Sequence, residues 1–215
     1  MDFLTHWLAF TPVFALPLIA AALGLIINER AGLLNLGAEG IMLCGALVGV
    51  VAFIEFNGNA ALGFIFAVLS GTFLGFCFGV FTVLFRTNQV LTGITFVFLG
   101  IGLTGLIGVP WVNKAFSAIE PIHIPFLTDI PIIGRFIFGQ DIVVYVTLIL
   151  AVLVWRFLYH TRMGLRLRAV GENPQAADAG GINVEGYRLL AATMGGAFIG
   201  LAGGYLSLAI ARIFV

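Results

Sequence analysis

The chain contains one long polar stretch, TRMGLRLRAVGENPQAADAGGINVEGYR (residues 161–188), between segments that read as apolar helix. Within it, Asn173 followed by Pro174 predicts a helix start, because an Asn side chain can accept from free backbone N–H groups and proline suits the first helical position. Gly180 and Gly181 predict the helix end, since glycine readily adopts the left-handed conformation common there. The predicted helix spans about two turns, roughly 10 Å. A helix this short needs support from neighbouring membrane helices or from another protein.

Composition places the chain among polytopic membrane proteins. Hydrophobic residues make up 61% of the sequence, charged residues 9%, and the mean hydropathy is +1.14, outside the range of soluble domains. The net charge is zero and no basic patch is interleaved with aromatics, so nothing suggests nucleic-acid binding. Cys44 and Cys77 lie in apolar runs, where cysteine is usually a small buried hydrophobe. The N-terminal MDFLTHW lacks the basic region of a cleavable signal peptide, so we expect the first apolar run to remain as an anchor.

Six apolar runs indicate helices that cross a hydrocarbon core of about 30 Å. The second run is short and crosses only if it takes residues from the Gly-rich segment before it. We therefore expect an all-α fold, a polytopic membrane bundle of about six helices that forms one domain over residues 1–215. The runs are 8–27, 41–54, 60–85, 90–112, 142–159 and 189–211.

Glycines four residues apart predict close helix packing, because small residues let helix backbones approach and packing drives helix association in lipid. Moving gates are the less favoured reading of the same pattern. The glycines concerned are Gly45 and Gly49; Gly71, Gly75 and Gly79; and Gly196, Gly200 and Gly204.

The positions of lysine and arginine predict the orientation, since short cytoplasmic loops are enriched in them. With the loop 161–188 in the cytosol, seven basic residues lie inside and three outside, and both termini lie outside. The inside set is Arg30, Arg86, Arg156, Arg162, Arg166, Arg168 and Arg188; the outside set is Lys114, Arg135 and Arg212.

The expected extracytoplasmic loop, residues 113–141, is long, rich in Ile, Phe and Pro, and poor in charge. It either lies along the membrane interface, offers a platform to an external protein, or packs as a lid on its own bundle. His123 in this loop has no second ligand at metal-site spacing, and neither has His6 or His160. We predict no metal site, no cofactor and no catalytic residue.

A second unusual segment is NERAGLLNLGAEGIM (28–42), which mixes glycines with polar groups. Broken helices at membrane depth are tolerated where they line a cavity, so Asn35 and Glu39 are candidates for a solute path. The alternative is a cytoplasmic turn in which Glu39 pairs with a nearby arginine. Asn88 and Gln89 present the same choice, because they either cap the next helix or face a solute.

At these residues a resemblance appears to the permease subunits of ATP-binding-cassette (ABC) importers in the branched-chain amino acid, simple-sugar and nucleoside group. The similarity covers nearly the whole chain and is closest to the second permease of nucleoside and simple-sugar importers. It rests on ERAGLLNLGAEGIMLCGA (29–46), TNQVLTGITFVFLGIGLTGLIG (87–108) and TRMGLRLRAVGENPQAADAGGINV (161–184).

The resemblance implies a coupling role for the helix 174–179, which would sit in a groove of a separate cytoplasmic ATPase. Gln175 departs from the family pattern, which has Glu there, but the loop is expected to act by shape. The chain has no GxxxxGK[ST] phosphate loop, so a partner would hydrolyse ATP. The coupling residues implied are Arg166, Arg168, Gly171, Glu172, Asn173, Pro174, Gln175, Ala176, Ala177 and Gly181, with Glu172 available to pair with an arginine.

The resemblance also implies a multi-pass protein of the bacterial inner membrane with three further partners. These are a second permease subunit, most simply in a heterodimer, an extracytoplasmic solute-binding protein or lipoprotein, and membrane lipid. The expected solute is small and polar, a nucleoside or a simple sugar. Family members continue through further helices, whereas this sequence stops at Val215. The alternatives are therefore a non-transporting fragment or scaffold of such a permease, or an ion-coupled secondary transporter.

Overall fold

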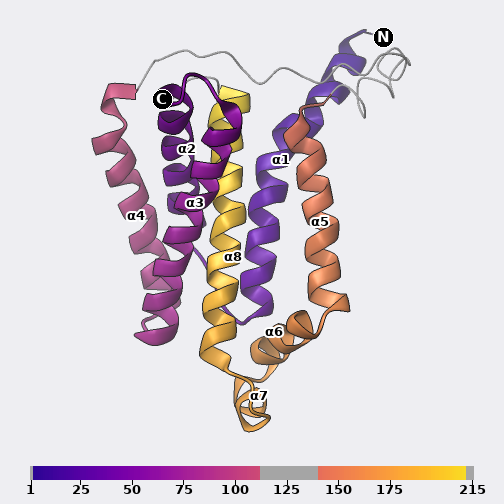
Figure 1. Cartoon of the computed structure of the whole chain (residues 1–215), viewed down its shortest axis with the longest axis vertical. Helices are drawn as coiled ribbons and strands as arrows, with labels where there is room; N and C mark the ends of the chain where they lie inside the picture. The colour runs from indigo at the N-terminus through magenta and orange to yellow at the C-terminus, as the bar shows by residue number, and fades with distance from the viewer. Residues whose placement is uncertain (1, 112–139, 212–215) are drawn as a thin grey trace.

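The computed structural model describes residues 2–111 and 140–211. In this part of the chain all the regular structure is helical (Figure 1). α3 and α8 each continue into a π-helical turn, Val80–Leu84 and Leu206–Ala211, and a 3-10 turn, Val109–Trp111, follows α4. The helices are α1 (Asp2–Arg30), α2 (Ala38–Glu55), α3 (Ala60–Gly79), α4 (Gln89–Ile107), α5 (Ile142–His160), α6 (Arg162–Glu172), α7 (Pro174–Ala179) and α8 (Val184–Tyr205).

The six predicted crossings are confirmed, since six described helices are long and apolar enough to span a bilayer. The short second run does take residues from the segment before it: α2 begins at Ala38 and reaches 18 residues. The first span continues to Arg30, beyond the predicted end of its apolar run. Pro12 and Pro17 both lie inside α1. The chain is thus a multi-pass helical bundle.

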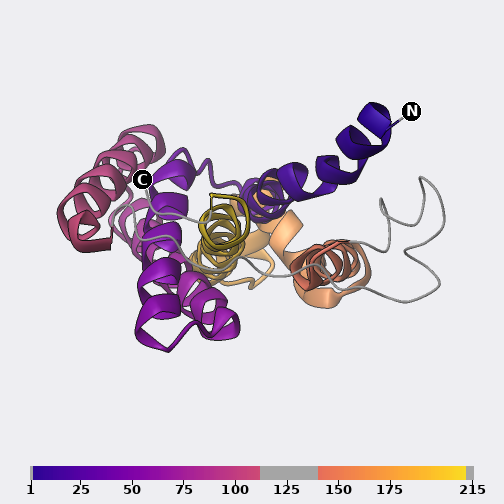
Figure 2. The same ribbon diagram turned by 90° about the horizontal axis from the view of Figure 1, so that it is seen from above.

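α8 lies at the centre of the bundle, with α1, α2 and α3 packed around it (Figures 1 and 2). Within the described chain, 61% of an apolar 18-residue stretch of the α8 span is buried, compared with 22% of such a stretch in α4 and 28% in α5. α4 and α5 lie at opposite edges of the bundle in both views. Their exposed faces carry large apolar side chains such as Leu91, Phe98 and Leu153, as expected for surfaces in contact with lipid or other apolar helices.

The predicted close packing through glycines is confirmed at the contact between α3 and α8. A Cβ atom at Gly71 would collide with the carbonyl oxygen of Gly196, and a Cβ atom at Gly196 would collide with that of Gly71. Only glycine allows the two backbones to come this close. Gly45 on α2 packs against Gly200 on α8 in the same way, with 2.8 Å between a Cβ at Gly45 and the Gly200 carbonyl oxygen.

The polar stretch forms α6 and α7, which lie together at one end of the bundle (Figure 1). The end of α1, the turn between α3 and α4 and the start of α8 lie at the same end, while α1 begins and α8 ends at the other. α6 was not predicted from the sequence. Its buried positions, Gly164, Leu167 and Val170, recur every three residues and turn one face toward the bundle, while Arg162 and Arg166 are exposed.

Most of the predicted extracytoplasmic loop 113–141, including His123, lies outside the described residues. The side chain of His6 is also outside what the structure describes. The loop's last residue, Asp141, is described and buried at the start of α5. Its carboxylate accepts a hydrogen bond of 3.2 Å from the hydroxyl of Tyr205 on α8. This contact ties α5 to the central helix at the end of the bundle far from α7.

Candidate functional site

α7 begins and ends at the predicted residues. The side-chain oxygen of Asn173 accepts a 3.0 Å hydrogen bond from the backbone N–H of Ala176, and Pro174 occupies the first helical position. At the other end, Gly181 adopts a left-handed φ of +78°. The N–H of Ile182 donates to the carbonyl of Ala177 (3.0 Å), which closes a Schellman motif. Gly180, with φ −81°, does not need the left-handed conformation.

The two faces of α7 differ in exposure. Gln175, Ala176 and Asp178 are exposed, whereas Ala177 is only 6% exposed and faces the rest of the molecule. α7 contacts both α6 and α8, which supplies the support that so short a helix needs. The result is a fixed projection at the end of the bundle with a small polar outer face, a shape suited to a groove in another protein.

Gly171 fixes α6 against the end of α1. A Cβ atom at Gly171 would collide with the carbonyl oxygen of Arg30 and lie 3.0 Å from the backbone nitrogen of Gly32. Gly32 itself is the left-handed residue of a second Schellman motif, in which the N–H of Leu33 donates to the carbonyl of Asn28. Gly171 was predicted as an ATPase-coupling residue, and the contact that the structure gives it is internal.

Three charged residues belong to the predicted coupling set. Arg168 and Arg166 contact tyrosine side chains, and Glu172 is exposed. The Arg168 guanidinium lies over the ring of Tyr159, 4.9 Å from its centroid, and Arg166 donates a long hydrogen bond of 3.5 Å to the hydroxyl of Tyr187. Glu172 is exposed and, within the described part of the chain, pairs with no arginine, contrary to expectation.

Among the predicted path residues, Asn35 lies in the turn before α2 and Asn88 is the N-cap of α4. Asn35 is 4% exposed; its side-chain oxygen accepts from the N–H of Gly37 (3.0 Å), and its amide nitrogen has no partner among the described residues. Asn88 caps α4 by accepting from Val90 (2.9 Å) and Leu91 (3.3 Å). These contacts favour the turn-and-cap alternative for both residues, and a role in a solute path stays a prediction.

Gln89 and Glu39 behave differently from the two asparagines. The Gln89 side-chain oxygen accepts a 2.7 Å hydrogen bond from the backbone N–H of Leu34, so the turn between α3 and α4 holds the turn between α1 and α2. Glu39 is exposed in the first turn of α2, and no arginine among the described residues pairs with it. Asn88 lines a largely apolar pocket of about 620 Å³ between α3 and α4, and the residues around that pocket include neither Asn35 nor Glu39.

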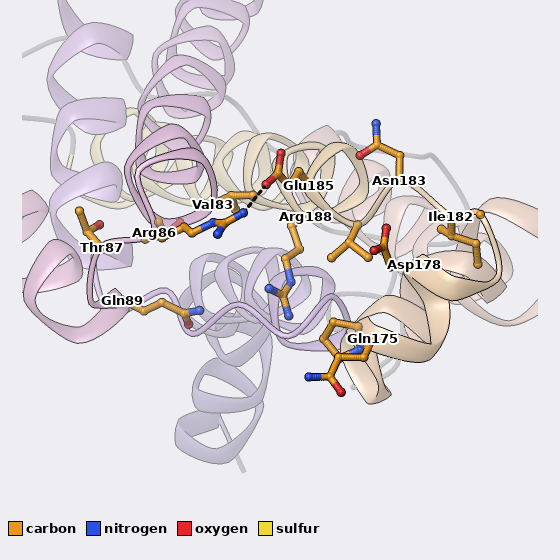
Figure 3. Close-up of a pocket in the computed structure, with 14 residues that line it drawn as sticks. Val83, Arg86, Thr87, Gln89, Gln175, Asp178, Ile182, Asn183, Glu185 and Arg188 are labelled. Atoms are coloured by element: carbon orange, nitrogen blue, oxygen red, sulfur yellow. Dashed lines mark hydrogen bonds and ion pairs between the residues drawn. The ribbon is translucent and has the colours of Figure 1, made fainter.

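An open pocket of about 840 Å³ lies beside α7 (Figure 3). One wall consists of exposed residues of α7 and the start of α8, and the other of the end of α3 and the turn that follows it. Its lining residues include Gln175 and Asp178 on the first wall, and Arg86 and Gln89 on the second. A partner segment that entered here would therefore touch α7 and the turn between α3 and α4 together.

Asn28 was not among the predicted site residues. It is fully buried in α1, packs against Gly195 of α8, and neither its side-chain oxygen nor its nitrogen has a hydrogen-bond partner in the described chain. The sequence signal was its place at the start of the polar segment 28–42. No group of three or more His, Cys, Asp or Glu side chains that could hold a metal occurs in the described residues.

Six apolar spans define a multi-pass integral membrane protein with a polar, capped projection at one end. The family described as branched-chain amino acid transport system / permease component matches residues 8–215. The chain belongs to this permease family.

Curated relatives agree with this assignment. The chain is 38% identical over 219 residues to a putative glucose ABC transporter permease of Haloferax volcanii, covering 100% of the chain and 66% of the relative. It is 36% identical over 218 residues to a guanosine ABC transporter permease of Bacillus subtilis (95% and 67%). It is 34% identical over 212 residues to a nucleoside ABC transporter permease of Lactococcus lactis (94% and 67%). The chain thus spans about two thirds of the length of these relatives. No solved structure matches it significantly.

Proposed function

We propose that this chain is a transmembrane permease subunit of an ABC importer, and that α7 couples it to a separate ATPase in the cytosol. The observation that carries the proposal is α7 itself: a short helix capped by Asn173, ended by Gly181 and held by its neighbours with one face exposed. Such a helix moves as a rigid body with the bundle, so a partner that grips its exposed face can transmit force to the spans. The ATPase supplies the nucleotide chemistry.

The proposed solute is a small uncharged molecule with a hydroxylated ring. The relatives named above are permeases for glucose, guanosine and nucleosides, and a sugar or ribose ring is what these solutes share. The candidate path side chains, Asn35, Asn88 and Gln89, are uncharged amides that can both donate and accept hydrogen bonds. The exposed position of Glu39 does not favour ion coupling through a buried acid.

The remaining partners in this proposal are a second permease subunit and an extracytoplasmic solute-binding protein or lipoprotein. The edge helices α4 and α5 offer wide apolar faces to other membrane helices. The family membership supports such an assembly in general terms.

The test is uptake of labelled guanosine and of labelled glucose into proteoliposomes that contain the assembled importer. We expect uptake when ATP is supplied to the side that carries α7, and none when only a proton or sodium gradient is imposed. Uptake driven by the gradient alone would remove the importer proposal in favour of a secondary transporter.

A further inference from the structure

Three turns meet at the α7 end of the bundle, and polar side chains join them in pairs. The turn between α3 and α4 contacts the start of α8 through an ion pair of 3.3 Å between Arg86 and Glu185 (Figure 3). Arg86 has a left-handed φ of +53°, which is uncommon for a residue with a side chain. Thr87 holds this turn in place, because both its N–H (3.2 Å) and its hydroxyl (2.8 Å) donate to the carbonyl of Phe81.

The turn between α1 and α2 is joined to both of the others. Its Leu34 N–H donates to the side chain of Gln89 at 2.7 Å, which connects it to the turn between α3 and α4. Its Ala31 carbonyl accepts a 3.3 Å hydrogen bond from Nε of Arg188, which connects it to the first turns of α8. The three contacts therefore close a circuit in which each turn touches the other two.

The circuit lies beside the coupling helix and the candidate path. Its side chains, Arg86, Gln89, Glu185 and Arg188, all line the pocket next to α7. Glu185 and Arg188 follow α7 directly in the chain, after the Schellman motif at Gly181. On the other side, Gln89 is next to Asn88, and Leu34 is next to Asn35.

The strengths of the contacts suit a link that moves. The side chains of Arg86 and Glu185 are 81% and 52% exposed, so their ion pair contributes little to stability and can break and re-form. The Gln89 contact is a single exposed hydrogen bond of 2.7 Å to the backbone of another turn. A displacement of the α8 start would therefore reach the two turns without unfolding either.

We propose that these four side chains, Arg86, Gln89, Glu185 and Arg188, form a coupling circuit that transmits displacement of α7 and the α8 start to the turns that carry Asn35 and Asn88. They are positioning residues, and Gln89 belongs to this circuit as a clamp on the Leu34 backbone. The inference rests on the proposed function for its role in transport, whereas the mechanical link is a property of this chain alone.

The mechanical link is tested by hydrogen–deuterium exchange on the chain in lipid nanodiscs. Gln89→Ala removes the acceptor of the Leu34 N–H, so exchange at Leu34 should rise directly. The informative variant is Arg86→Glu, because the hydrogen bond and ion pair of Arg86 in the described chain go to Glu185 and not to the turn 31–37. If the circuit couples the α8 start to the turn 31–37, exchange across 31–37 should rise about threefold in Arg86→Glu. It should return toward wild type in the double variant Arg86→Glu with Glu185→Arg.

The control is Arg162→Glu, the same charge reversal at an exposed arginine of α6. It should leave exchange in the turn 31–37 unchanged. Two results would overturn the proposed circuit. One is unchanged exchange of residues 31–37 in Arg86→Glu, and the other is increased exchange that the charge swap does not restore.

The consequence for transport is measured separately, as ATP hydrolysed per solute taken up by the reconstituted importer. Arg86→Glu should raise this ratio, and the charge swap should lower it again. An unchanged ratio would contradict the role of the circuit in coupling. Absence of ATP-driven uptake in the wild type would contradict the proposed function instead, and the exchange result would still decide whether the mechanical link exists.

Discussion

At the junction of α6 and α7, Asn173 serves two helices. Its backbone N–H donates to the carbonyl of Ala169 (3.0 Å) and ends α6, while its side chain accepts from Ala176 (3.0 Å) and begins α7. The direction of the chain changes at this residue because its φ and ψ are extended. A single residue thus ends α6 through its backbone and begins the proposed coupling helix through its side chain.

We predict that Asn173→Ala loosens α7 while the bundle stays folded. Loss of an N-cap typically costs about 1 kcal/mol, which corresponds to about fivefold faster local opening. Hydrogen–deuterium exchange of residues 176–179 in nanodiscs measures this effect. Gln175→Ala, at an exposed neighbouring position that caps nothing in the described chain, is the control. Equal exchange in the two variants would mean that the cap does not hold α7.

The close contact of Gly171 gives a second prediction. Gly171→Ala places a methyl group against the Arg30 carbonyl and should destabilise the docking of α6 on α1, by roughly 1–3 kcal/mol as for other overpacked sites. Thermal unfolding of the detergent-solubilised chain measures it. Gly180→Ala is the matched control, because a Cβ there meets its nearest atoms at 3.4 Å, an ordinary contact. A similar melting temperature for both variants would contradict the contact.

For single residues, the sequence predicted the helix caps better than the contacts between residues far apart in the chain. Asn173, Pro174 and Gly181 act through their immediate neighbours in the chain, so their roles can be read from local order. Asn35 and Asn88 could not be assigned, because a cap and a solute contact use the same amide group. The contact of Gly171 with Arg30 joins residues far apart in sequence, and no local pattern indicates it.

Among the elements, the contact between α3 and α8 depends on small residues in register. Gly71 and Gly75 of α3 meet Gly196 of α8 so closely that backbone touches backbone. In lipid such contacts drive association, because apolar side chains gain nothing by leaving the acyl chains. The four-residue spacing of these glycines was sufficient to predict a tight bundle, although not which stripe packs against which.

We predict that Gly71→Ala separates α3 from α8 and lowers the melting temperature in detergent. The added methyl would collide with the Gly196 carbonyl, at a cost of roughly 1–3 kcal/mol. Gly102→Ala on α4 is the control, since a Cβ at that glycine meets nothing within 4 Å in the described chain. A stability loss in the control as large as in Gly71→Ala would argue against the glycine contact as the source of bundle stability.

α6 shows what the sequence left out at the level of elements. Its arginines give residues 161–173 a polar average that is typical of a loop, and only the buried positions 164, 167 and 170 reveal a helix with one apolar face. α7 was predicted because both of its ends carry strong signals. α6 has a cap at Thr161, whose hydroxyl accepts from the N–H of Gly164 (3.0 Å), but Thr is a weaker signal than Asn followed by Pro.

In the whole molecule, the arginines predicted to lie in the cytosol gather at one end of the bundle. All seven of the arginines predicted to lie inside are on helices or turns at the α7 end, and the three basic residues predicted outside lie beyond the described residues. Six spans return the chain to the side from which it started. Composition and periodicity were enough to predict this architecture, because a bilayer admits few others. The central place of α8 required the structure, since helix order in space is not encoded in helix order along the chain.

Cysteine labelling tests whether α7 faces the cytosol and contacts the ATPase, as we propose. Cys44 and Cys77 are first replaced by Ala, and Gln175→Cys then offers a thiol on the exposed face of α7. Glu55→Cys, exposed at the opposite end of the bundle, is the control. A membrane-impermeant maleimide should label the Glu55→Cys protein in intact cells and the Gln175→Cys protein only after permeabilisation, with labelling of the latter reduced when the ATPase is bound. Labelling of the Gln175→Cys protein in intact cells, or labelling unaffected by the ATPase, would contradict the account.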